Sequence, residues 1–343
     1  MKAALIGLGM VSGTYGAALA DLAGTVTLAG VYARDPDARA RFLRQHGAVL
    51  GAVCRAYGSI DEICADPEVD FAILTTPPNA RIEIVRALAA AGKPILMEKP
   101  VERTAAAARE ICDICARAEV PLGIMLQHRM RPAAQALTRI CETGALGPLH
   151  MVEVVVPWWR DQAYYDEPGR GSYGRDGGGV LISQAIHTLD LMLSITGPVA
   201  EATAMVAQSG FHRMEAEDFV SAGLRFASGA LGTLFATTAS FPGSTERITF
   251  HFASASAVLE GNLLTVTGQD GRQDSHGTRA TTGAGADPMG FTADWHRDMI
   301  ADFATALDAA RPPRVPGHAA LAVHDLIEML ERSGRLGQKV LAP

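Results

Sequence analysis

Short apolar runs alternate with helical patterns through the first third of the chain. The runs of strand length are residues 3–6, 26–32, 70–76, 94–97 and 121–126. Between them, alanine-rich or amphipathic segments predict helices after Gly7 to about Leu22, from Asp35-Pro36 onward, over 79–91 and over 104–119. The signal is weak near residues 49–53. Such alternation predicts a parallel sheet with helices on both faces.

The pattern changes after about residue 148. Segments such as HMVEVVV, DFVSAGLRF, GALGTLFATTAS, ERITFHF and ASAVLEG alternate polar and apolar positions or are rich in β-branched residues. They predict a mainly antiparallel sheet with one open face. Residues 268–290 are glycine-rich and predict a long loop. Helical patterns return at 291–310 and 318–333. The fold class is therefore α/β, with a first domain over 1–122 and a second, α+β domain over 123–343. The helix over 318–333 is a candidate to pack back on the first domain.

Composition narrows the class of protein. The chain has 343 residues, which suits two domains, and its net charge of −7 comes without a run of Lys and Arg. A nucleic-acid or anionic-membrane partner is therefore not expected. Apolar stretches fall short of the roughly 18–20 residues that cross a bilayer, and we interpret MKAALIGLGM as mature protein rather than a signal peptide.

The cysteines favour a reduced, cytoplasmic protein. There are five, an odd number that does not suit a disulfide framework. Cys112 and Cys115 have CxxC spacing but lie inside a helical pattern without a second ligand pair, so we expect buried side chains and no metal.

A glycine-rich turn follows the first predicted strand. In Gly7-Leu8-Gly9-Met10-Val11, the first glycine permits a tight turn and the second lets a pyrophosphate approach the backbone at a helix N-terminus. Ser12 stands at the usual place of a third glycine, beside Gly13. In an alternating α/β region, this turn predicts a dinucleotide site.

The second strand ends in Val31-Tyr32-Ala33-Arg34-Asp35. A carboxylate at the strand tip would bind the ribose of NAD, whereas an arginine suits the 2′-phosphate of NADP. With Ala33 at the tip and Arg34 beside it, we expect NADP to be preferred. A shift of one residue would place Asp35 on the ribose, so NAD stays open.

The segment GGGVLISQAIHTLDLM, residues 177–192, carries polar residues in an apolar helical pattern. Ser183, His187 and Asp190 share one face of an α-helix, and a separate apolar stripe consists of Ile182, Ile186, Leu189 and Leu193. The glycines would let backbone pass close to a ligand or a neighbouring loop.

Residues GKPILMEKP (92–100) and GGGVLISQAIHTLD, in this order, resemble the glucose–fructose oxidoreductase / inositol dehydrogenase / rhizopine catabolism (Gfo/Idh/MocA) family of NAD(P)-dependent oxidoreductases. Thr76-Pro77-Pro78-Asn79 and Gln127-His128-Arg129 support the resemblance. It implies a Rossmann dinucleotide-binding domain, then a substrate domain with an open antiparallel sheet through which homodimers or homotetramers form. The cofactor-binding set it implies is Gly7, Gly9, Met10, Val11, Ala33, Arg34, Thr76, Pro77, Asn79, Glu98, Lys99 and Gln127.

Catalytic roles follow from the same resemblance. It places the EKP lysine, Lys99, near nicotinamide and substrate, and makes His187 the acid/base. Oxidising an alcohol needs a base with a pKa near the working pH, which suits histidine, and a lysine ammonium would stabilise alkoxide charge. Lys99 and His187 thus form the expected acid–base pair, in which Lys99 either stabilises the oxygen or exchanges the proton role with His187. Asp190 would orient the imidazole or bind a sugar hydroxyl. Ser183 stands where the family often has Asp, and Arg81 where it often has His. The SQAIH form is similar to a subset that includes dehydrogenases of sugars and nucleotide-linked sugar acids.

The expected function is an oxidoreductase that moves hydride between NADP or NAD and a secondary hydroxyl of a sugar, cyclitol or sugar acid. Alternatives are reduction of small carbonyls or trans-dihydrodiols, a glycosidase that retains its NAD, and a ligand sensor without chemistry. Candidates for substrate contacts, besides Lys99 and His187, are His128, Arg129, Trp158, Arg160, Tyr173, Ser183 and Gln184.

Overall fold

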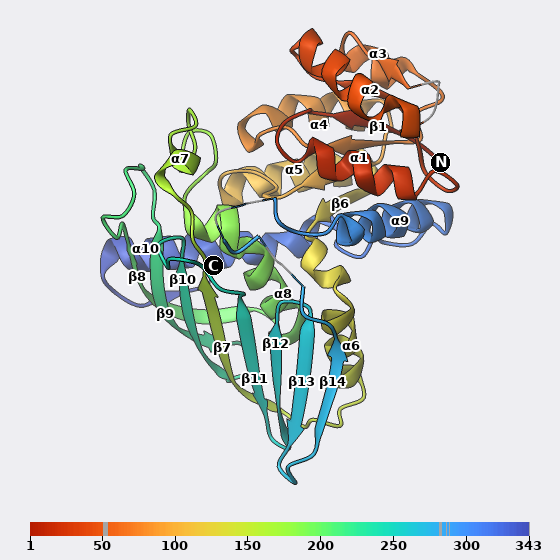
Figure 1. Ribbon diagram of the computed structural model, residues 1–343. Helices are drawn as coiled ribbons and strands as arrows, with labels where there is room; N and C mark the ends of the chain where they lie inside the picture. Colours follow the sequence, from red (N-terminus) through yellow and green to blue (C-terminus); the bar gives the residue numbers. More distant parts are fainter. Residues whose placement is uncertain (51–53, 281–282, 286, 288, 343) are drawn as a thin grey trace. The chain divides into compact units, whose positions relative to one another are not determined.

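The computed structural model describes residues 1–50, 54–280, 283–285, 287 and 289–342. The chain forms two compact units, one of Met1–Gln127 with Ala293–Leu321 and the other of His128–Thr292 with Ala322–Pro343. The weak sequence signal at 49–53 falls partly on residues 51–53, which lie outside this description. Each unit has its own sheet (Figure 1).

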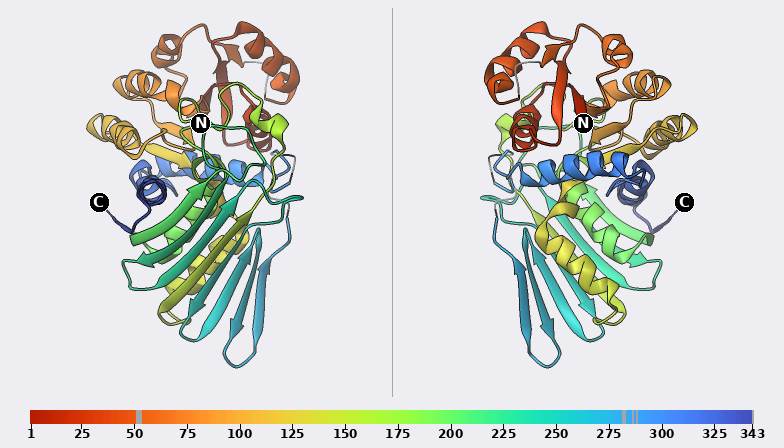
Figure 2. Two further views of the ribbon diagram at one scale, coloured as in Figure 1. Left: turned by 90° about the vertical axis from the view of Figure 1, so that its left-hand side faces the viewer. Right: turned by 90° about the vertical axis from the view of Figure 1, so that its right-hand side faces the viewer.

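The first unit is a parallel six-stranded sheet in the order β3-β2-β1-β4-β5-β6. Its strands are β1 (Lys2–Ile6), β2 (Thr27–Tyr32), β3 (Arg55–Ala56), β4 (Phe71–Leu74), β5 (Ile95–Glu98) and β6 (Leu122–Met125). Its helices are α1 (Ser12–Asp21), α2 (Pro36–Leu50), α3 (Ile60–Ala65), α4 (Arg81–Ala90), α5 (Ala105–Arg117) and α9 (Asp294–Asp308), with the 3-10 turns η1 (Pro78–Ala80) and η4 (Gly317–Ala320). Figure 2 shows helices on both faces of this sheet. Strands β4, β5 and β6 are buried throughout, as expected of parallel strands covered twice.

Strand order reverses between β1 and β4, which is where open parallel sheets bind ligands, at the carboxyl ends of the strands. The candidate cofactor residues of this unit lie at or after these carboxyl ends. Gly7 follows β1, Ala33 follows β2, Thr76 follows β4 and Gln127 follows β6, while Glu98 ends β5 and Lys99 comes next. The α/β reading with a Rossmann sheet is confirmed.

The second unit is a nine-stranded sheet in the order β14-β13-β12-β11-β7-β10-β9-β8-β15. Its strands are β7 (Leu149–Pro157), β8 (Val199–Ala207), β9 (Phe219–Phe226), β10 (Leu231–Thr237), β11 (Arg247–Phe252), β12 (Ala255–Glu260), β13 (Leu263–Gly268), β14 (Gln273–Gly277) and β15 (Val340–Leu341). All neighbours are antiparallel except β7 and β10, which pair in parallel.

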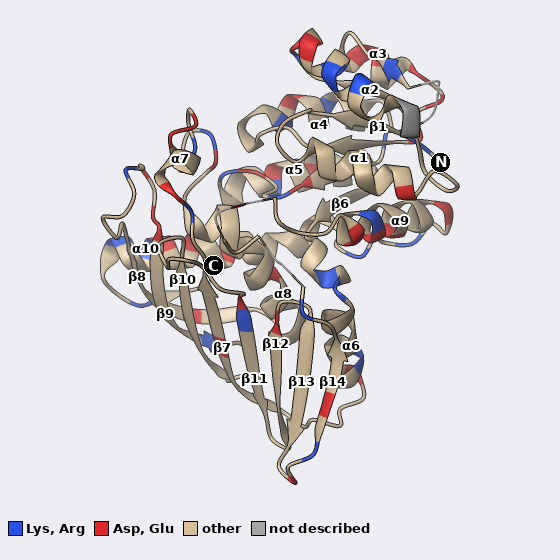
Figure 3. Ribbon diagram, viewed as in Figure 1, with Lys and Arg blue, Asp and Glu red and all other residues tan. Residues whose placement is uncertain are grey.

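One face of the large sheet is covered by helices. Helices α6 (Pro132–Glu142) and α8 (Ile186–Thr196) lie against it, as both views in Figure 2 show. Alternate residues of β9 and β10 are buried and exposed. Charged residues are sparse on the strands and frequent around α7 (Gln162–Tyr165) (Figure 3). The expected open-faced sheet is therefore confirmed.

The structure differs from the sequence expectation in three places. Residues 273–277 form β14 inside the predicted loop 268–290, because their backbone pairs with β13 although every side chain is exposed. The first unit extends to Gln127 and includes α9, whose Phe303 ring packs 5.4 Å from that of Phe71. The predicted helix over 318–333 begins as the 3-10 turn η4 in the first unit. Helix α10 (Leu321–Leu336) follows and lies in the second unit from Ala322 on, where Ser333 accepts from the Ala204 N–H of β8 at 2.9 Å. No helix among the described residues is long and apolar enough to cross a bilayer.

Candidate functional site

The glycine turn after β1 has the geometry that a dinucleotide requires. Gly7 has φ +103°, and a Cβ there would lie 2.8 Å from backbone atoms of Thr75 and Thr76, so no side chain fits. Its N–H donates to the Tyr32 carbonyl at 2.8 Å, which ties the turn to β2. A Cβ at Gly9 would meet nothing within 4 Å, so this backbone borders open space just before α1.

Polar atoms at the neighbouring strand ends lack protein partners. The side-chain oxygens Oγ1 of Thr76 and Oε1 of Gln127 are buried and accept no hydrogen bond within the described chain. Met10 is 51% exposed and Val11 half-buried, and α1 begins at Ser12. Unfilled acceptors, open space at Gly9 and a helix N-terminus together fit a nicotinamide dinucleotide.

The two side chains at the tip of β2 that would distinguish NAD from NADP, those of Asp35 and Arg34, differ in their contacts. Asp35 is committed to α2, because one oxygen accepts from the Asp37 N–H at 2.9 Å and the other lies 3.4 Å from Arg41. Arg34 is exposed and pairs with none of the described residues. Arg39, which the sequence analysis missed, donates to the Ala33 carbonyl at 3.3 Å and shapes the tip.

A buried guanidinium joins the loops after β4 and β5. Arg81 is 2% exposed and donates to the Thr76 carbonyl at 2.9 and 2.7 Å, to the Glu98 carbonyl at 2.5 Å and to the Pro100 carbonyl. Burial lowers the pKa of Arg81 to about 10, with Glu98 opposing the shift. Arg81 therefore positions the segment that carries Lys99. Pro77 and Asn79, in the same β4 loop, are exposed.

The Glu98 side chain points into the interior of the first unit. Its carboxylate accepts from the Tyr15 hydroxyl at 2.9 Å and from the Lys99 N–H at 3.0 Å, and lies 3.7 Å from His296 of α9. Burial would raise the pKa of Glu98, but the hydrogen bond and charge of His296 and the charge of Lys99 lower it overall. The carboxylate expected to contact cofactor thus has protein partners and orients the half-buried Lys99 through its backbone.

The glycines at 177–179, before His187, allow the backbone of a neighbouring loop, at Glu217, to approach closely. A Cβ at Gly179 would lie 1.7 Å from the Glu217 carbonyl. The Glu217 carboxylate accepts from the N–H groups of Gly179 and Leu181 at 3.0 Å each, and its carbonyl accepts from Val180 at 2.9 Å. Glu217 therefore caps the helical segment, and the close approach is to a loop of the same unit.

The helical segment begins with a π-helical turn, η3 (Leu181–Ala185), and continues as α8. Ser183 lies in that turn, so the α-helical spacing that put it on one face with His187 does not hold. The expected polar strip is also not exposed: His187 is 7% and Asp190 1% exposed, because residues from η2 (Gln127–Met130) cover them.

Asp190 binds an arginine. Its two oxygens accept from Nε and Nη2 of Arg129 at 2.7 and 2.6 Å, a bidentate pair. Burial raises the pKa of Asp190, and Arg129 opposes the shift. The partner found for Asp190 is thus Arg129 rather than the imidazole or ligand that we expected.

His187 stacks on a second histidine. The ring centroids of His187 and His128 are 4.7 Å apart with planes at 29°. His128 Nε2 lies 2.5 Å from Nη2 of Arg131, and Nη1 of Arg131 donates to Glu246 at 2.6 Å. Glu246 also accepts from Trp158 at 3.2 Å. Arg131 and Glu246 are 115 residues apart, so no local motif could have revealed the pair.

The remaining candidates for substrate contacts differ in whether their polar atoms already have protein partners. Arg160 donates to the carbonyls of Gly283 and Gly285 at 2.7 and 2.6 Å, and Trp158 is buried beside it. Gln184 donates to Tyr164 at 3.4 Å, while its buried Oε1 accepts nothing within the described chain. Tyr173 is 47% exposed.

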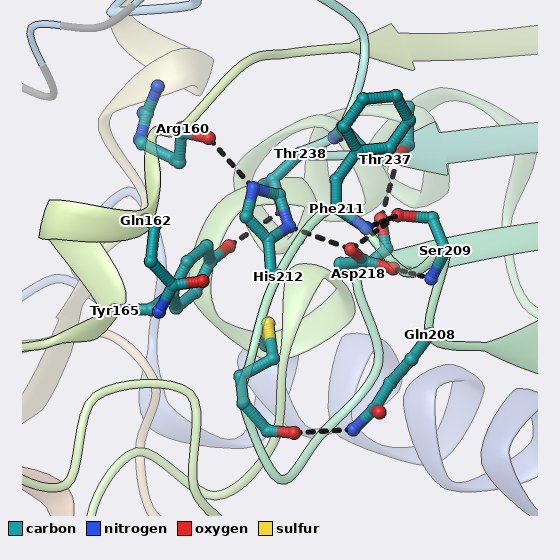
Figure 4. A network of polar contacts seen from close by, with 12 residues as sticks. Arg160, Gln162, Tyr165, Gln208, Ser209, Phe211, His212, Asp218, Thr237 and Thr238 are labelled. Carbon is teal, nitrogen blue, oxygen red and sulfur yellow. Dashed lines mark hydrogen bonds and ion pairs between the residues drawn. The ribbon is translucent and has the colours of Figure 1, made fainter.

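Figure 4 shows how Arg160 is held by a buried ion pair. His212 Nε2 donates to the Arg160 carbonyl at 2.8 Å, and Nδ1 lies 2.7 Å from Asp218. Burial would lower the pKa of His212, but these two hydrogen bonds raise it overall. Ser209 also bonds Asp218 rather than the imidazole, so the trio is a structural brace and not a nucleophile–base pair.

Lys99 belongs to the first unit and His187 to the second. Within the residues described, no three His, Cys, Asp or Glu side chains gather as a metal ion requires. All five cysteines are free thiols, and burial raises the pKa of Cys112 to about 11 and of Cys115 to about 12.

Comparison with protein families assigns both parts of the chain. A profile described as "Oxidoreductase family, NAD-binding Rossmann fold" matches residues 1–126, and the "GFO/IDH/MocA C-terminal domain" matches residues 134–280. The rhizopine catabolism protein MocA of Rhizobium meliloti is 33% identical over 149 residues, which are 43% of this chain and only 45% of that protein. The myo-inositol 2-dehydrogenase of Thermotoga maritima is 26% identical over 289 residues, 82% of each chain.

Solved structures agree in fold. The WlbA dehydrogenase of Bordetella pertussis, in complex with NADH and UDP-GlcNAcA, is 26% identical with a TM-score of 0.84, covering 100% of this chain and 98% of that one. Levoglucosan dehydrogenase in complex with NADH and levoglucosan has a TM-score of 0.86 over 100% and 99% of the chains, but at 20% identity it shows the fold alone.

Proposed function

Because the chain belongs to the Gfo/Idh/MocA family of oxidoreductases, we propose that it is an NAD(P)-dependent dehydrogenase acting on a secondary hydroxyl of a sugar or cyclitol. The first unit binds the dinucleotide and the second binds the substrate. The observation that carries this is the strand switch between β1 and β4. The Gly7 turn there leaves room for backbone contact alone, and Thr76 Oγ1 has no hydrogen-bond partner among the residues that the structure describes.

Lys99 and His187 divide the work of the reaction. The bound nicotinamide supplies the hydride acceptor. His187 takes the hydroxyl proton during oxidation and returns it during reduction, since imidazole titrates near neutral pH. Lys99 stabilises the oxygen as negative charge develops. Arg81 and Glu98 support Lys99 through the backbone of its loop.

The contacts of the second unit favour an uncharged substrate. A carboxylate is bound best by an arginine that donates from two nitrogens. Arg129 already uses Nε and Nη2 on Asp190, and Arg160 uses both Nη nitrogens on backbone carbonyls, so that its buried Nε is the atom left without a partner among the described residues. Gln184 Oε1 is a buried acceptor without a donor within the described residues, as a hydroxyl ligand would require. We therefore place neutral polyols ahead of uronates.

Arg34 supports NADP as the preferred cofactor. The carboxylate of Asp35, the residue that would bind the ribose of NAD, contacts Asp37 and Arg41, whereas the exposed Arg34 is available for a 2′-phosphate. The WlbA dehydrogenase of Bordetella pertussis contains NADH, so the proposed preference for NADP rests on Arg34 alone.

The open face of the large sheet supports a homo-oligomer. Leu231 of β10 is 49% exposed and Met205 of β8 is 64% exposed on a sheet whose other face is covered. A second copy would bury them. Sedimentation equilibrium of the wild type and of Leu231→Glu with Met205→Glu tests this, and a monomeric wild type would refute it.

The function is tested with a panel of polyols, aldoses and matched uronates, read by nicotinamide absorbance with NADP⁺ and with NAD⁺. We expect turnover of a neutral member, and at least 100-fold lower kcat in Lys99→Met and in His187→Gln with cofactor affinity within about threefold. Near wild-type kcat in either variant would remove the mechanism. Sugar release without net cofactor reduction would instead establish a glycosidase, and ligand binding without turnover a sensor.

A further inference from the structure

Two buried histidines stand face to face where the proposed reaction requires one acid/base. His128, in η2, is 4% exposed, and His187, in the first turn of α8, is 7% exposed. Their ring centroids are 4.7 Å apart and their planes meet at 29°. Two imidazolium ions at this separation in a buried site would repel each other strongly, so one ring has to stay neutral while the other carries the proton.

The contact with Arg131 decides which ring stays neutral. Nη2 of Arg131 lies 2.5 Å from Nε2 of His128. A guanidinium has only N–H donors, so Nε2 of His128 has to accept through its lone pair. In a neutral ring that accepts at Nε2, the hydrogen is on Nδ1. Protonating Nε2 would set an N–H against an N–H and a cation against a cation.

Arg131 is itself held in place by a buried carboxylate. The Arg131 and Glu246 side chains are 1% and 3% exposed and 2.6 Å apart. Nη1 of Arg131 also donates to the Gly261 carbonyl at 3.1 Å, and Nε1 of Trp158 donates to the second oxygen of Glu246 at 3.2 Å. The guanidinium therefore cannot turn away from His128 without leaving the buried Glu246 carboxylate without its cation.

We propose that Arg131 and Glu246 hold His128 as the neutral Nδ1–H tautomer, so that only His187 of the two stacked histidines exchanges a proton in the reaction. During oxidation the hydroxyl proton goes to His187 while the hydride goes to the nicotinamide, and both return during reduction. His128 is a positioning residue: its neutral ring fixes the plane of His187 and presents a π face to the imidazolium.

Other charged groups around His187 do not replace this arrangement. On its own helix, Asp190 is neutralised by Arg129 of η2. The Tyr164 hydroxyl of α7 accepts from Gln184 at 3.4 Å. Lys99 is the cation that the proposed function brings to the same substrate oxygen. The elements packed on α8 are α6 and β7, whose titratable residues are Arg139, Cys141, Glu142, His150 and Glu153. Of these, Arg139, Glu142 and His150 are exposed to solvent. The carboxylate of Glu153 lies 3.7 Å from His251. Burial raises the pKa of the Cys141 thiol, which keeps it neutral.

The tautomer can be measured without turnover. Long-range ¹H–¹⁵N NMR of the full chain with NADP⁺, assigned with His128→Gln and His187→Gln, should show His128 as a neutral Nδ1–H ring that does not titrate between about pH 5 and 9. His187 should titrate. An Nε2–H pattern or an ordinary titration of His128 would overturn the proposal, whatever the enzyme turns over.

Variants separate positioning from catalysis. His128→Gln keeps an acceptor for Arg131, so kcat should fall by no more than about tenfold, against at least 100-fold in His187→Gln. Equal losses would make His128 an acid/base and refute the proposal. Arg131→Lys keeps a cationic donor and should leave His128 neutral. In Arg131→Met with Glu246→Gln, which leaves no buried charge unpaired, His128 should begin to titrate and the His187 midpoint should fall.

The catalytic half of this proposal rests on the proposed function, and the two can fail separately. If no substrate is turned over but His128 has the predicted tautomer, the function fails and the tautomer assignment stands. If turnover depends on His187 while His128 titrates, the function stands and the assignment fails. Should the double variant not fold, the wild-type spectrum decides alone.

Discussion

Replacing Arg81 with methionine tests the connection between the two cofactor loops. The guanidinium is fully buried and donates to the carbonyls of Thr76, Glu98 and Pro100. Each buried acceptor that loses its donor costs about 1–3 kcal/mol. Removing a desolvated cation offsets part of that loss, so we expect the free energy of unfolding to fall by about 3–5 kcal/mol. For units of 150–250 residues, at about 2–4 °C per kcal/mol, this lowers Tm by about 6–20 °C.

The matched control is Arg86→Met on the same helix. The Arg86 side chain is 50% exposed and pairs with Glu83 and Glu110 at 2.9 and 2.6 Å. Exposed pairs contribute about 0–1 kcal/mol, so Tm should change by less than about 3 °C. Calorimetry gives Tm, and titration calorimetry gives the affinity for NADP⁺. That affinity should fall at least tenfold in Arg81→Met only. If both variants melt within about 3 °C of each other, the buried arginine does not order these loops.

Three further substitutions test other parts of the site. In Arg34→Ala, KM for NADP⁺ should rise at least tenfold and KM for NAD⁺ stay within twofold, by steady-state kinetics; equal changes would contradict a 2′-phosphate contact. Asp190→Asn leaves Arg129, whose side chain is 17% exposed, without its anion, and urea unfolding should show a loss of about 3 kcal/mol, the lower end of the cost of breaking a buried pair; a loss below about 1 kcal/mol would contradict the pairing of Asp190 with Arg129. The pKa of His212 is raised and that of Asp218 lowered. The stabilisation by His212 is therefore complete below its pKa in the unfolded chain, about 6.5, and is lost as pH rises through its raised pKa in the folded protein. The stabilisation by Asp218 is complete above its pKa in the unfolded chain, about 3.9, and is lost as pH falls through its lowered pKa in the folded protein. The stability difference between wild type and His212→Gln should shrink from about pH 6 to 9, and a constant difference would refute this.

The strands, helices and turns of the fold could be predicted from the sequence because each of them depends mainly on residues close together in the chain. The apolar runs ending at Ile6 and Leu74 have the length and composition of buried parallel strands, and Gly7 has a positive φ that glycine adopts easily. Strand β14 was missed because its side chains carry no apolar alternation, and backbone pairing with β13 alone makes it a strand.

The site was predicted less completely, since its partners come from distant segments. Arg129 and Asp190 were both candidates, but nothing in their local sequence indicated that they would pair across 61 residues. The spacing argument for Ser183 and His187 assumed a regular α-helix, but Ser183 lies in a π-helical turn that Glu217 caps. The burial of a side chain also depends on residues from the whole unit. For this reason the sequence did not show that His187 and Asp190, expected on an exposed polar strip, are buried.

The central claim is that Lys99 and His187 act on one hydroxyl oxygen beside the nicotinamide. A crystal structure of the protein with NADPH and the neutral polyol that the panel identifies would measure this directly. The account predicts Nζ of Lys99 and a ring nitrogen of His187 both within about 3.2 Å of the same substrate oxygen. A substrate oxygen bound by neither group, or by Arg129 freed from Asp190, would contradict it.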